Sequence, residues 1–479
     1  MSIAKNYFYN LLYQMVTLIL PLITIPYISR VLGTEGVGIN AYTNSIIQYF
    51  ILMGTIGITL YGNKEIAYVR DDKVKLSRTF WGIFYLKCIT TFISYVLFML
   101  FLIVVGEYHF IFLLQSVFII AAVVDISWLF MGLEDFKKTV MRNLFVKIIG
   151  VICIFLFVKT SNDLWKYVLI LSMSQLLGHL SLWFYLPKTV NKIKLKWQDI
   201  KRHLIPSLAL FIPQFAIQLY IILNKTMLGI LSNLNEVGLF DNADKIVKIV
   251  LAIVTALGIV MLPRISNTFA RGEIEQVKNY IYNSFDFATY LSVPLMFGLG
   301  SIALEFAPWF FGPEFTKTGI LICIISPIIV LIAWSNVLGQ QFLMPVGRIK
   351  GYTVSVIVGA VVNFTFNLLL IGRFHSIGAA IATLIAEFSV TSVQLYYVRQ
   401  DLQIKKLLHS TWKYLISGII MYLIVRYIGV ALDGGVKSIV IQIIGGIISY
   451  FVLLFLLKSD LNKKLFGVGL MYLLKVIRR

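Results

Sequence analysis

The chain has little charge for its length: Asp, Glu, Lys and Arg make up 13% of 479 residues, against about a quarter in soluble domains. It also has few cysteines, only Cys88, Cys153 and Cys323. With 59% hydrophobic residues, this composition excludes an ordinary soluble globular protein. All three cysteines fall in apolar runs, so we expect them to pack as small side chains and not to form disulfides or metal sites.

Motifs of nucleotide-driven pumps and of hydrolytic enzymes are also missing. The string closest to a P-loop, Gly57 to Lys64, has Asn63 where the motif requires lysine. Neither H-E-x-x-H nor G-x-S-x-G occurs, and the five histidines are scattered along the chain. We therefore expect no cofactor, no metal and no catalytic residues.

Long apolar runs are what the sequence does have. A bilayer crossing needs about 20 apolar residues, and fourteen stretches of about this length follow one another. They lie near residues 6–28, 37–61, 80–105, 110–131, 139–158, 165–186, 204–231, 237–262, 281–303, 319–344, 351–371, 377–398, 411–430 and 438–457. The sequence thus predicts an all-α integral membrane protein with about 14 transmembrane helices.

Basic residues are distributed unevenly over the connections between these stretches. Counted over alternate connections and the termini, 29 Lys and Arg fall on the side of Met1 and five on the other. Basic loops stay in the cytoplasm, so both termini are predicted to be cytoplasmic. The net charge of +20 then reflects orientation and contact with anionic membrane lipids, and no nucleic-acid partner is expected.

Weak internal similarity relates spans that are six apart. Val37-Gly38-Ile39 matches Val237-Gly238-Leu239, and Phe130-Met131 matches Leu343-Met344. An even separation gives the two halves the same orientation in the membrane. We predict two parallel six-helix lobes around a central cavity, at residues 1–203 and 204–408. Residues 409–479 would add two transmembrane helices and a basic cytoplasmic tail. Pro21 and Pro26 in the first span are candidate hinges.

Charged residues inside spans are the main candidates for function, because an unpaired charge in a membrane is costly. Lys87, Asp125 and Lys147 each lie seven or eight residues from the cytoplasmic end of their span, roughly 10–12 Å deep at about 1.5 Å per residue. They could line a cavity as one cluster. Equally, they could be a structural ion pair with one lysine that reaches the interface.

The second predicted lobe carries further cations. Lys225 and Lys245 lie at similar depth, and Lys225 has no acidic residue three or four positions away. Asp241 with Lys245, and Asp244 with Lys248, have the i, i+4 spacing of ion pairs on one helix. Lys225, Lys245 and Lys248 are candidates to bind an anion such as pyrophosphate.

Two single acids lie in later spans. Asp286 in the ninth span and Glu387 in the twelfth could couple transport to a cation, or could pair with the lysines.

Two strings resemble the signatures of a known family. The segment Pro26-Tyr27-Ile28-Ser29-Arg30-Val31-Leu32-Gly33-Thr34-Glu35-Gly36-Val37-Gly38 leaves the first span. Gly238-Leu239-Phe240-Asp241-Asn242-Ala243-Asp244-Lys245-Ile246 opens the eighth, and Leu262-Pro263-Arg264 ends it. They resemble bacterial polysaccharide (O-antigen or capsule) repeat-unit flippases of the multidrug/oligosaccharidyl-lipid/polysaccharide exporter superfamily.

The resemblance implies translocation of an undecaprenyl-pyrophosphate-linked oligosaccharide across the bacterial plasma membrane, by alternating access and without ATP. It implies that Arg30, which stands at the arginine of the first motif, helps to bind the pyrophosphate. Relatives with two additional C-terminal helices use them to form a groove for the lipid tail. The polysaccharide polymerase and assembly proteins would be partners, and the chain would be a monomer.

Two other functions stay open. A cation-coupled multidrug antiporter would share the superfamily, but the two additional spans and the excess of cations count against it. A membrane glycosyltransferase or polymerase would need a large extramembrane loop with paired carboxylates, and the connections predicted here are short.

Overall fold

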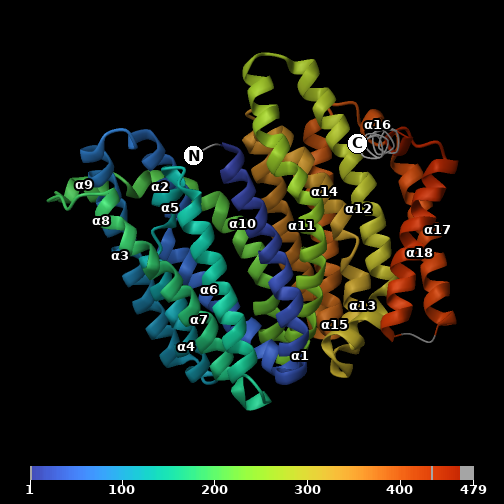
Figure 1. The fold of residues 1–479 in the computed structure, drawn as a ribbon, viewed down its shortest axis with the longest axis horizontal. Coiled ribbons are helices and arrows are strands. Elements are labelled where there is room, and N and C mark those ends of the chain that lie inside the picture. The colour runs from blue at the N-terminus through green and yellow to red at the C-terminus, as the bar shows by residue number, and fades with distance from the viewer. Residues whose placement is uncertain (1–2, 433–434, 464–479) are drawn as a thin grey trace, which may run out of the picture. The chain divides into compact units, whose positions relative to one another are not determined.

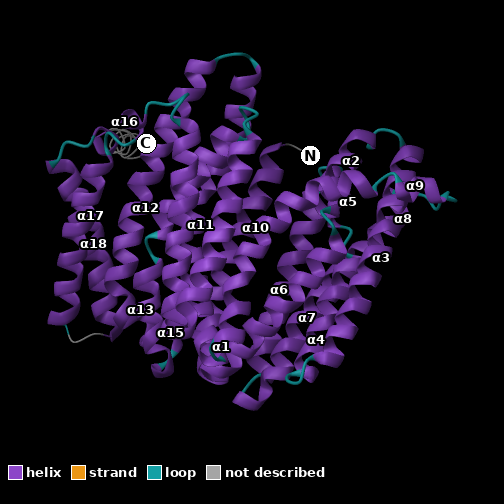
Figure 2. Cartoon of the chain, turned by 180° about the vertical axis from the view of Figure 1, so that it is seen from behind, coloured by secondary structure: helices purple, strands orange, loops and turns teal. Residues whose placement is uncertain are grey.

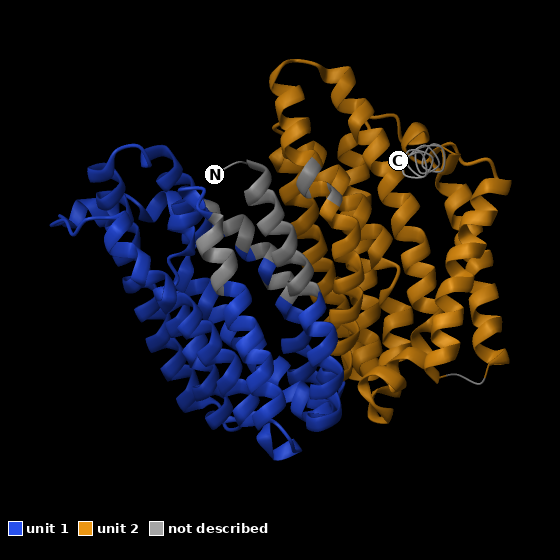
Figure 3. Cartoon of the chain, viewed as in Figure 1, with its two compact units in different colours: residues 1–238 blue, residues 239–479 orange. Residues whose placement is uncertain are grey.

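The computed structural model describes residues 3–432 and 435–463, with the side chains of 3–18, 136–142 and parts of 210–221 and 257–260 excepted. The predicted basic tail therefore lies mostly outside the described residues. Every regular element in the described part is a helix (Figure 2). Contacts divide the chain into two compact units, unit 1 (Met1–Gly238) and unit 2 (Leu239–Arg479) (Figure 3).

Each unit consists of long helices that run alongside one another (Figure 1). The helices of unit 1 are α1 (Ile3–Thr55), α2 (Ile58–Val69), α3 (Lys73–Val104), α4 (His109–Val124), α5 (Ser127–Gly132), α6 (Phe136–Phe157), η1 (Ser161–Asp163), α7 (Leu164–Ser181), η2 (Leu182–Tyr185), α8 (Leu186–Thr189), α9 (Trp197–Lys201) and α10 (Leu204–Leu231). The helix α11 (Leu234–Ala270) starts in unit 1 and continues into unit 2.

The remaining helices of unit 2 are α12 (Ile274–Phe311), η3 (Pro313–Phe315), α13 (Thr316–Ile325), α14 (Ile328–Ser335), the π-helix η4 (Asn336–Leu343), α15 (Ile349–Val398), α16 (Ile404–Leu407), α17 (Thr411–Ala431) and α18 (Gly435–Leu456). The described residues include nine helical stretches long and apolar enough to cross a membrane, or ten with the bent pair Pro313–Ile325 and Ile328–Leu343. The chain is thus a multi-pass membrane protein.

Two of these stretches are each long enough to cross twice. At 1.5 Å per residue, the 53 residues of α1 and the 50 of α15 far exceed a bilayer core of about 30 Å. Both helices fold back, α1 at Gly33 (φ 69°) and α15 at His375 (φ 51°). These turns fall between the predicted first and second, and the predicted eleventh and twelfth, spans. With two shorter apolar helices at Asn143–Phe157 and Ile222–Leu231, the described helices agree with about 14 predicted crossings.

The glycines of the predicted repeat face each other inside unit 1. A Cβ atom added to Gly38 would lie 1.7 Å from the carbonyl oxygen of Leu234. One added to Gly238 would lie 2.1 Å from the carbonyl oxygen of Thr34. Because residues 34 and 38 meet 234 and 238 reciprocally, the two repeat segments cross by direct backbone contact. Only glycine allows this approach.

The helix α10 belongs to unit 1 by its contacts. The Thr226 hydroxyl lies 2.9 Å from the Ser45 hydroxyl and 3.2 Å from that of Tyr49. Gly229 lies against the ring of Tyr42. The predicted division into 1–203, 204–408 and 409–479 stays a prediction.

The two C-terminal helices are attached to α12 by polar groups at two levels. Glu305 on α12 accepts hydrogen bonds from Arg426 on α17 (2.7 Å) and Gln442 on α18 (2.7 Å). Elsewhere on α12, the Tyr290 carbonyl oxygen accepts a hydrogen bond from the Tyr450 hydroxyl of α18 (3.1 Å). A buried cluster of tyrosine rings, Tyr290, Tyr414 and Tyr450, fills the space between these helices. The additional helices are therefore an integral part of unit 2.

Candidate functional site

The fourth span breaks in the middle of unit 1, at a predicted site residue. The helix α4 ends at Val124 and α5 begins at Ser127, because Asp125 has an extended backbone (φ −70°, ψ 109°). The Asp125 carboxylate accepts a hydrogen bond from the Ser127 amide (2.9 Å), the first amide of α5. Lys87 on α3 donates its ammonium proton to the Asp125 carbonyl oxygen (2.7 Å). The structure thus brings together Lys87 and Asp125, as their similar predicted depth suggested.

A histidine completes this cluster, and the sequence interpretation missed it. His179 on α7 places Nδ1 2.9 Å from Asp125 Oδ1. The neighbouring indole of Trp183 donates to the Val124 carbonyl oxygen (2.8 Å). The histidines are scattered along the sequence, and His179 lies one span away from Lys147. Only the packing of α7 against α4 puts it beside Asp125. We call Lys87, Asp125 and His179 the break cluster. Lys147, the third predicted member of the charge cluster, is half-buried on α6.

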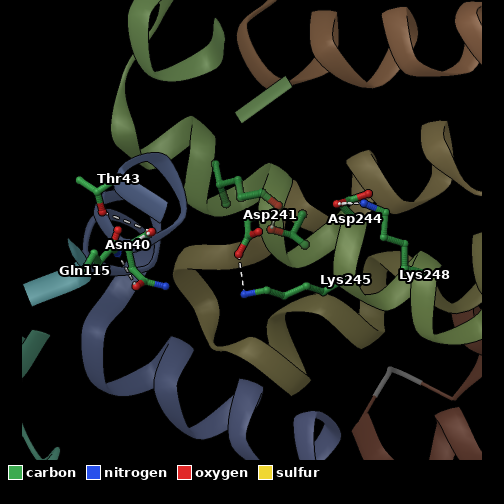
Figure 4. A network of polar contacts seen from close by, with 9 residues as sticks. Asn40, Thr43, Gln115, Asp241, Asp244, Lys245 and Lys248 are labelled. Carbon is green, nitrogen blue, oxygen red and sulfur yellow. Dashed lines mark hydrogen bonds and ion pairs between the residues drawn. The ribbon is translucent and has the colours of Figure 1, made fainter. Parts of the chain in front are cut away.

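The lysines at the start of α11 form the two predicted ion pairs. Lys245 Nζ lies 2.5 Å from Asp241, and Lys248 Nζ lies 2.7 Å from Asp244 (Figure 4). The carboxylate side chains are 3% and 9% exposed, whereas the lysine side chains are 36% and 43% exposed. The lysine side chains are therefore the more accessible part of each pair.

The other predicted cations lie in unit 1. Arg30 is exposed on α1, three residues before the turn at Gly33, and Lys225 is half-buried on α10. Pro21 and Pro26 both lie within α1, whose one residue with non-helical dihedral angles is Gly33. The first and second spans therefore change direction at the glycine.

The two predicted coupling acids lie in different surroundings of unit 2. Asp286 on α12 accepts a hydrogen bond from Tyr414 of α17 (2.9 Å), so it ties the additional helices to the second unit. Glu387 is buried in the second half of α15.

A group of amide side chains surrounds the π-helix of unit 2. Gln341 donates to the Asn336 side-chain oxygen (3.1 Å), and Gln394 on α15 donates to the Ser355 hydroxyl (3.1 Å). A Cβ atom on Gly339 would lie 2.7 Å from Gln394 Nε2. The side-chain oxygens of Gln341 and Gln394 are buried acceptors with no donor. No carboxylate or cation takes part in these contacts.

An apolar pocket of about 440 Å³ opens in unit 2. Its lining comes from α12, α14, the second half of α15 and α17, and no polar surface contributes to it. The lining residues are Met296, Pro327, Val330, Leu331, Trp334, Leu384, Ile385, Phe388 and Leu415. Such a pocket in a membrane protein suits a hydrocarbon chain.

Comparison with known proteins places the chain in a family. A family model described as polysaccharide biosynthesis protein matches residues 3–269, more than half of the chain. The chain belongs to the polysaccharide biosynthesis protein family. Among its relatives is a putative O-antigen transporter of Escherichia coli (strain K12), 27% identical over 409 residues that cover 84% of this chain and 98% of the relative.

Solved structures show the fold of this family member. A structure of the lipid II flippase MurJ in an inward closed conformation superposes with a TM-score of 0.77 at 15% identity, over 94% of this chain and 99% of the other. An inward-facing multidrug resistance MATE transporter of the MOP superfamily superposes with a TM-score of 0.62 at 13% identity, over 82% and 96%. The predicted all-α transporter fold is confirmed. The named relatives are transporters and flippases, which agrees with the prediction that the chain is not an enzyme.

Proposed function

We propose that this protein moves undecaprenyl-pyrophosphate-linked oligosaccharide repeat units from the inner to the outer leaflet of the plasma membrane by alternating access. The observation that carries the proposal is the family match, together with a relative named as an O-antigen transporter that aligns along nearly its whole length. The fold shared with a lipid II flippase is consistent with a lipid-linked substrate. Both termini would be cytoplasmic, and the protein would act as a monomer.

The pyrophosphate would bind to the cations that the spans carry. Lys245 and Lys248 pair with the buried carboxylates of Asp241 and Asp244, while the lysine side chains are partly exposed. An anion can then be bound without first breaking the ion pairs, because an ammonium group has three donors. Arg30 and Lys225, both in unit 1, remain further candidates to bind the anion.

The polyprenyl tail would need an apolar surface within the membrane. The pocket of unit 2 is lined entirely by apolar side chains, among them Trp334 and Phe388, and includes Leu415 of the additional helices. Its volume is sufficient for a few isoprene units and not for a whole polyprenyl chain, so the rest of the tail would remain in the lipid.

The predicted hinges and coupling acids have roles in the same proposal. Pro21 and Pro26 would allow the first span to bend as the cavity changes its access. Asp286 and Glu387 would be the sites of cation coupling in the second unit. If the Asp286→Asn variant transports with the same dependence on ions as wild type, Asp286 is not a coupling site.

The test is complementation of a bacterial strain that lacks its own repeat-unit flippase. The leaflet accessibility of undecaprenyl-linked repeat units is compared between wild type and the variants Arg30→Ala, Lys225→Ala and Lys245→Ala at equal membrane abundance. Wild type should expose the repeat units outside, and the variants should retain them inside. Lys405→Ala is the matched control, since it removes one exposed cation outside the spans.

A double variant separates anion binding from structure. Lys245→Ala alone leaves the buried Asp241 carboxylate without its ion pair. Asp241→Asn combined with Lys245→Gln removes the pair without leaving an isolated charge. Recovery of transport in the double variant would mean that the pair is structural; continued loss supports binding of the substrate anion by Lys245.

The same strain distinguishes the antiporter. If wild type leaves repeat units inside while cells become resistant to cationic drugs, the proposal is wrong and the protein is a multidrug antiporter.

A further inference from the structure

The segment that joins the sixth predicted span to the seventh is rich in positive charge. We call residues 188–202 the connector; it contains six basic residues and a single acidic one, Asp199. The basic residues, all of them exposed, are Lys188, Lys192, Lys194, Lys196, Lys201 and Arg202. The Asp199 carboxylate accepts a hydrogen bond from the Lys196 amide (3.0 Å), in the first turn of α9. The connector therefore presents a large excess of positive charge.

Basic and apolar side chains alternate in the middle of the connector, which reads Lys192-Ile193-Lys194-Leu195-Lys196-Trp197. Val190 (φ −131°, ψ 147°) and Lys196 (φ −91°, ψ 154°) have extended backbones, and the described residues between them form no helix. Successive side chains of an extended segment point to opposite sides. Ile193 and Leu195 are half-buried, so the three alternating lysines form a row on the exposed side.

Contacts of the backbone fix the connector to unit 1. The Asn191 carbonyl oxygen accepts a hydrogen bond from the Trp81 indole (2.9 Å), and the Asn191 amide donates to the Ser77 hydroxyl (2.9 Å). A Cβ atom on Gly82 would lie 2.7 Å from the Asp199 carbonyl oxygen, so α9 packs directly on α3. The connector thus lies at the end of unit 1 where α2 and α5 also lie (Figure 1). Its row of lysines is held in place by these contacts.

Basic residues of other connections on the predicted cytoplasmic side have acidic partners. Arg70 lies 2.8 Å from the Glu134 carboxylate. Arg348 contacts both carboxylate oxygens of Asp401, at 2.7 and 2.9 Å. In residues 188–202, all of which the structure describes, no basic side chain forms an ion pair with a carboxylate. The positive charge of the connector is therefore left for a partner outside the chain.

Large apolar side chains are exposed beside these cations. Trp197 is 63% exposed, and Phe184, just before the connector, is 83% exposed. Tryptophan next to lysine is typical of the membrane–water interface, where the ring lies among lipids and the ammonium groups reach the phosphates. An acidic soluble protein would match the charge but not the exposed rings, so these side chains together favour a lipid surface.

We propose that the connector binds the phosphate groups of anionic phospholipids at the membrane surface. The three alternating lysines contact the headgroup phosphates, and the Trp197 ring lies among the lipids beside them. Because α10 follows the connector directly, bound lipid holds the start of this helix at the depth of the headgroups. The proposal does not depend on which substrate the protein transports.

The experiment uses the full-length chain in nanodiscs of equal parts phosphatidylglycerol and phosphatidylcholine. The signal is the tryptophan fluorescence of wild type minus that of Trp197→Phe, which isolates Trp197 from the other tryptophans. Bromine, a quencher, is placed on the acyl chains of only one of the two lipids, so both samples have the same composition. We expect bromine on phosphatidylglycerol to quench at least about threefold more than bromine on phosphatidylcholine, since each basic residue favours an anionic surface by roughly fivefold.

A charge variant and a matched control separate the connector from the overall charge of the protein. The charge variant combines Lys192→Gln, Lys194→Gln and Lys196→Gln, and each is compared with its own Trp197→Phe counterpart. We expect the two brominated lipids to quench this variant almost equally. The control combines three exposed lysines of other connections, Lys73→Gln, Lys405→Gln and Lys463→Gln. It should keep the wild-type preference.

Three results would overturn the proposal. Equal quenching by the two brominated lipids in wild type would show that the connector does not select anionic lipids. No quenching of Trp197 by either lipid would show that the connector lies away from the membrane, which leaves an acidic soluble partner. A control that loses the preference as fully as the charge variant would assign it to overall charge.

Discussion

The predicted fourth span in unit 1 and the predicted tenth span in unit 2 are both irregular helices, but different side chains stabilise them. In unit 1 the helix is interrupted at Asp125: Lys87 donates to the Asp125 carbonyl oxygen and the Asp125 carboxylate accepts from the Ser127 amide, while His179 lies beside that carboxylate. In unit 2 the helix widens into a π-helix, and neutral amides surround it. Charged side chains therefore surround the irregular backbone of unit 1, and neutral amides surround that of unit 2.

The largest effect should come from the buried lysine of unit 1. Lys87→Met removes the donor to the Asp125 carbonyl oxygen and leaves the negative charge of Asp125 without the nearby ammonium group. An uncompensated buried charge costs roughly 3–5 kcal/mol. We expect a strong fall in the thermal unfolding midpoint in detergent, followed by tryptophan fluorescence. Adding Asp125→Asn should restore most of it, because no isolated charge remains. An unchanged midpoint in Lys87→Met would show that the cluster does not stabilise unit 1.

The close backbone contact at Gly38 and Gly238 should also be sensitive to substitution. Gly38→Ala and Gly238→Ala each place a methyl group against a backbone carbonyl, and overpacking costs about 1–3 kcal/mol or more. Because the contact is reciprocal, both variants should lower the midpoint similarly. Gly106→Ala, where an added Cβ meets nothing within 4 Å, is the control and should change little. Unequal losses at Gly38 and Gly238 would contradict a symmetric crossing.

Substitutions among the amide side chains around η4 should reduce stability less than substitutions in the break cluster of unit 1. Gln394→Leu removes one hydrogen bond, but the Ser355 hydroxyl keeps its bond to the Tyr352 carbonyl. We expect a loss of about 1 kcal/mol, the net value of a typical hydrogen bond. The same unfolding assay checks it. A loss as large as that of Lys87→Met would remove the energetic difference between the two units.

The smallest expected effect is a pH dependence of folding stability that comes from His203, just before the seventh span. His203 is buried between Tyr61 and Gly82, and burial, together with the charge of Arg202, lowers its pKa to about 4. In the unfolded chain its pKa is about 6.5, so the unfolded state binds the proton first as the pH falls. Stability should decline from about pH 6.5 to about pH 4 and not further through this group.

His203→Phe tests this dependence. The drop in unfolding midpoint between pH 7 and pH 4.5 should be smaller in the variant than in wild type. An identical drop in both proteins would assign the acid sensitivity to other groups.

Contacts within one helix could be predicted, and those between distant helices only in part. The pairs Asp241 with Lys245 and Asp244 with Lys248 follow from a spacing of four residues. Lys87 and Asp125 could be suspected from equal depth. His179 could not, because its contact depends on how α7 packs on α4, and periodicity along one helix does not specify its neighbours.

The amino-acid sequence by itself determined the membrane-spanning helices, because hydrophobic length acts locally along the chain. It placed a break between residues 28 and 37, and the structure put the turn within that break at Gly33. Only the tertiary structure decided that Glu305 holds Arg426 and Gln442, and that Asp125 is shared by Lys87 and His179. The physical reason is that a buried charge in a membrane must find a partner, but which partner it meets depends on helix packing.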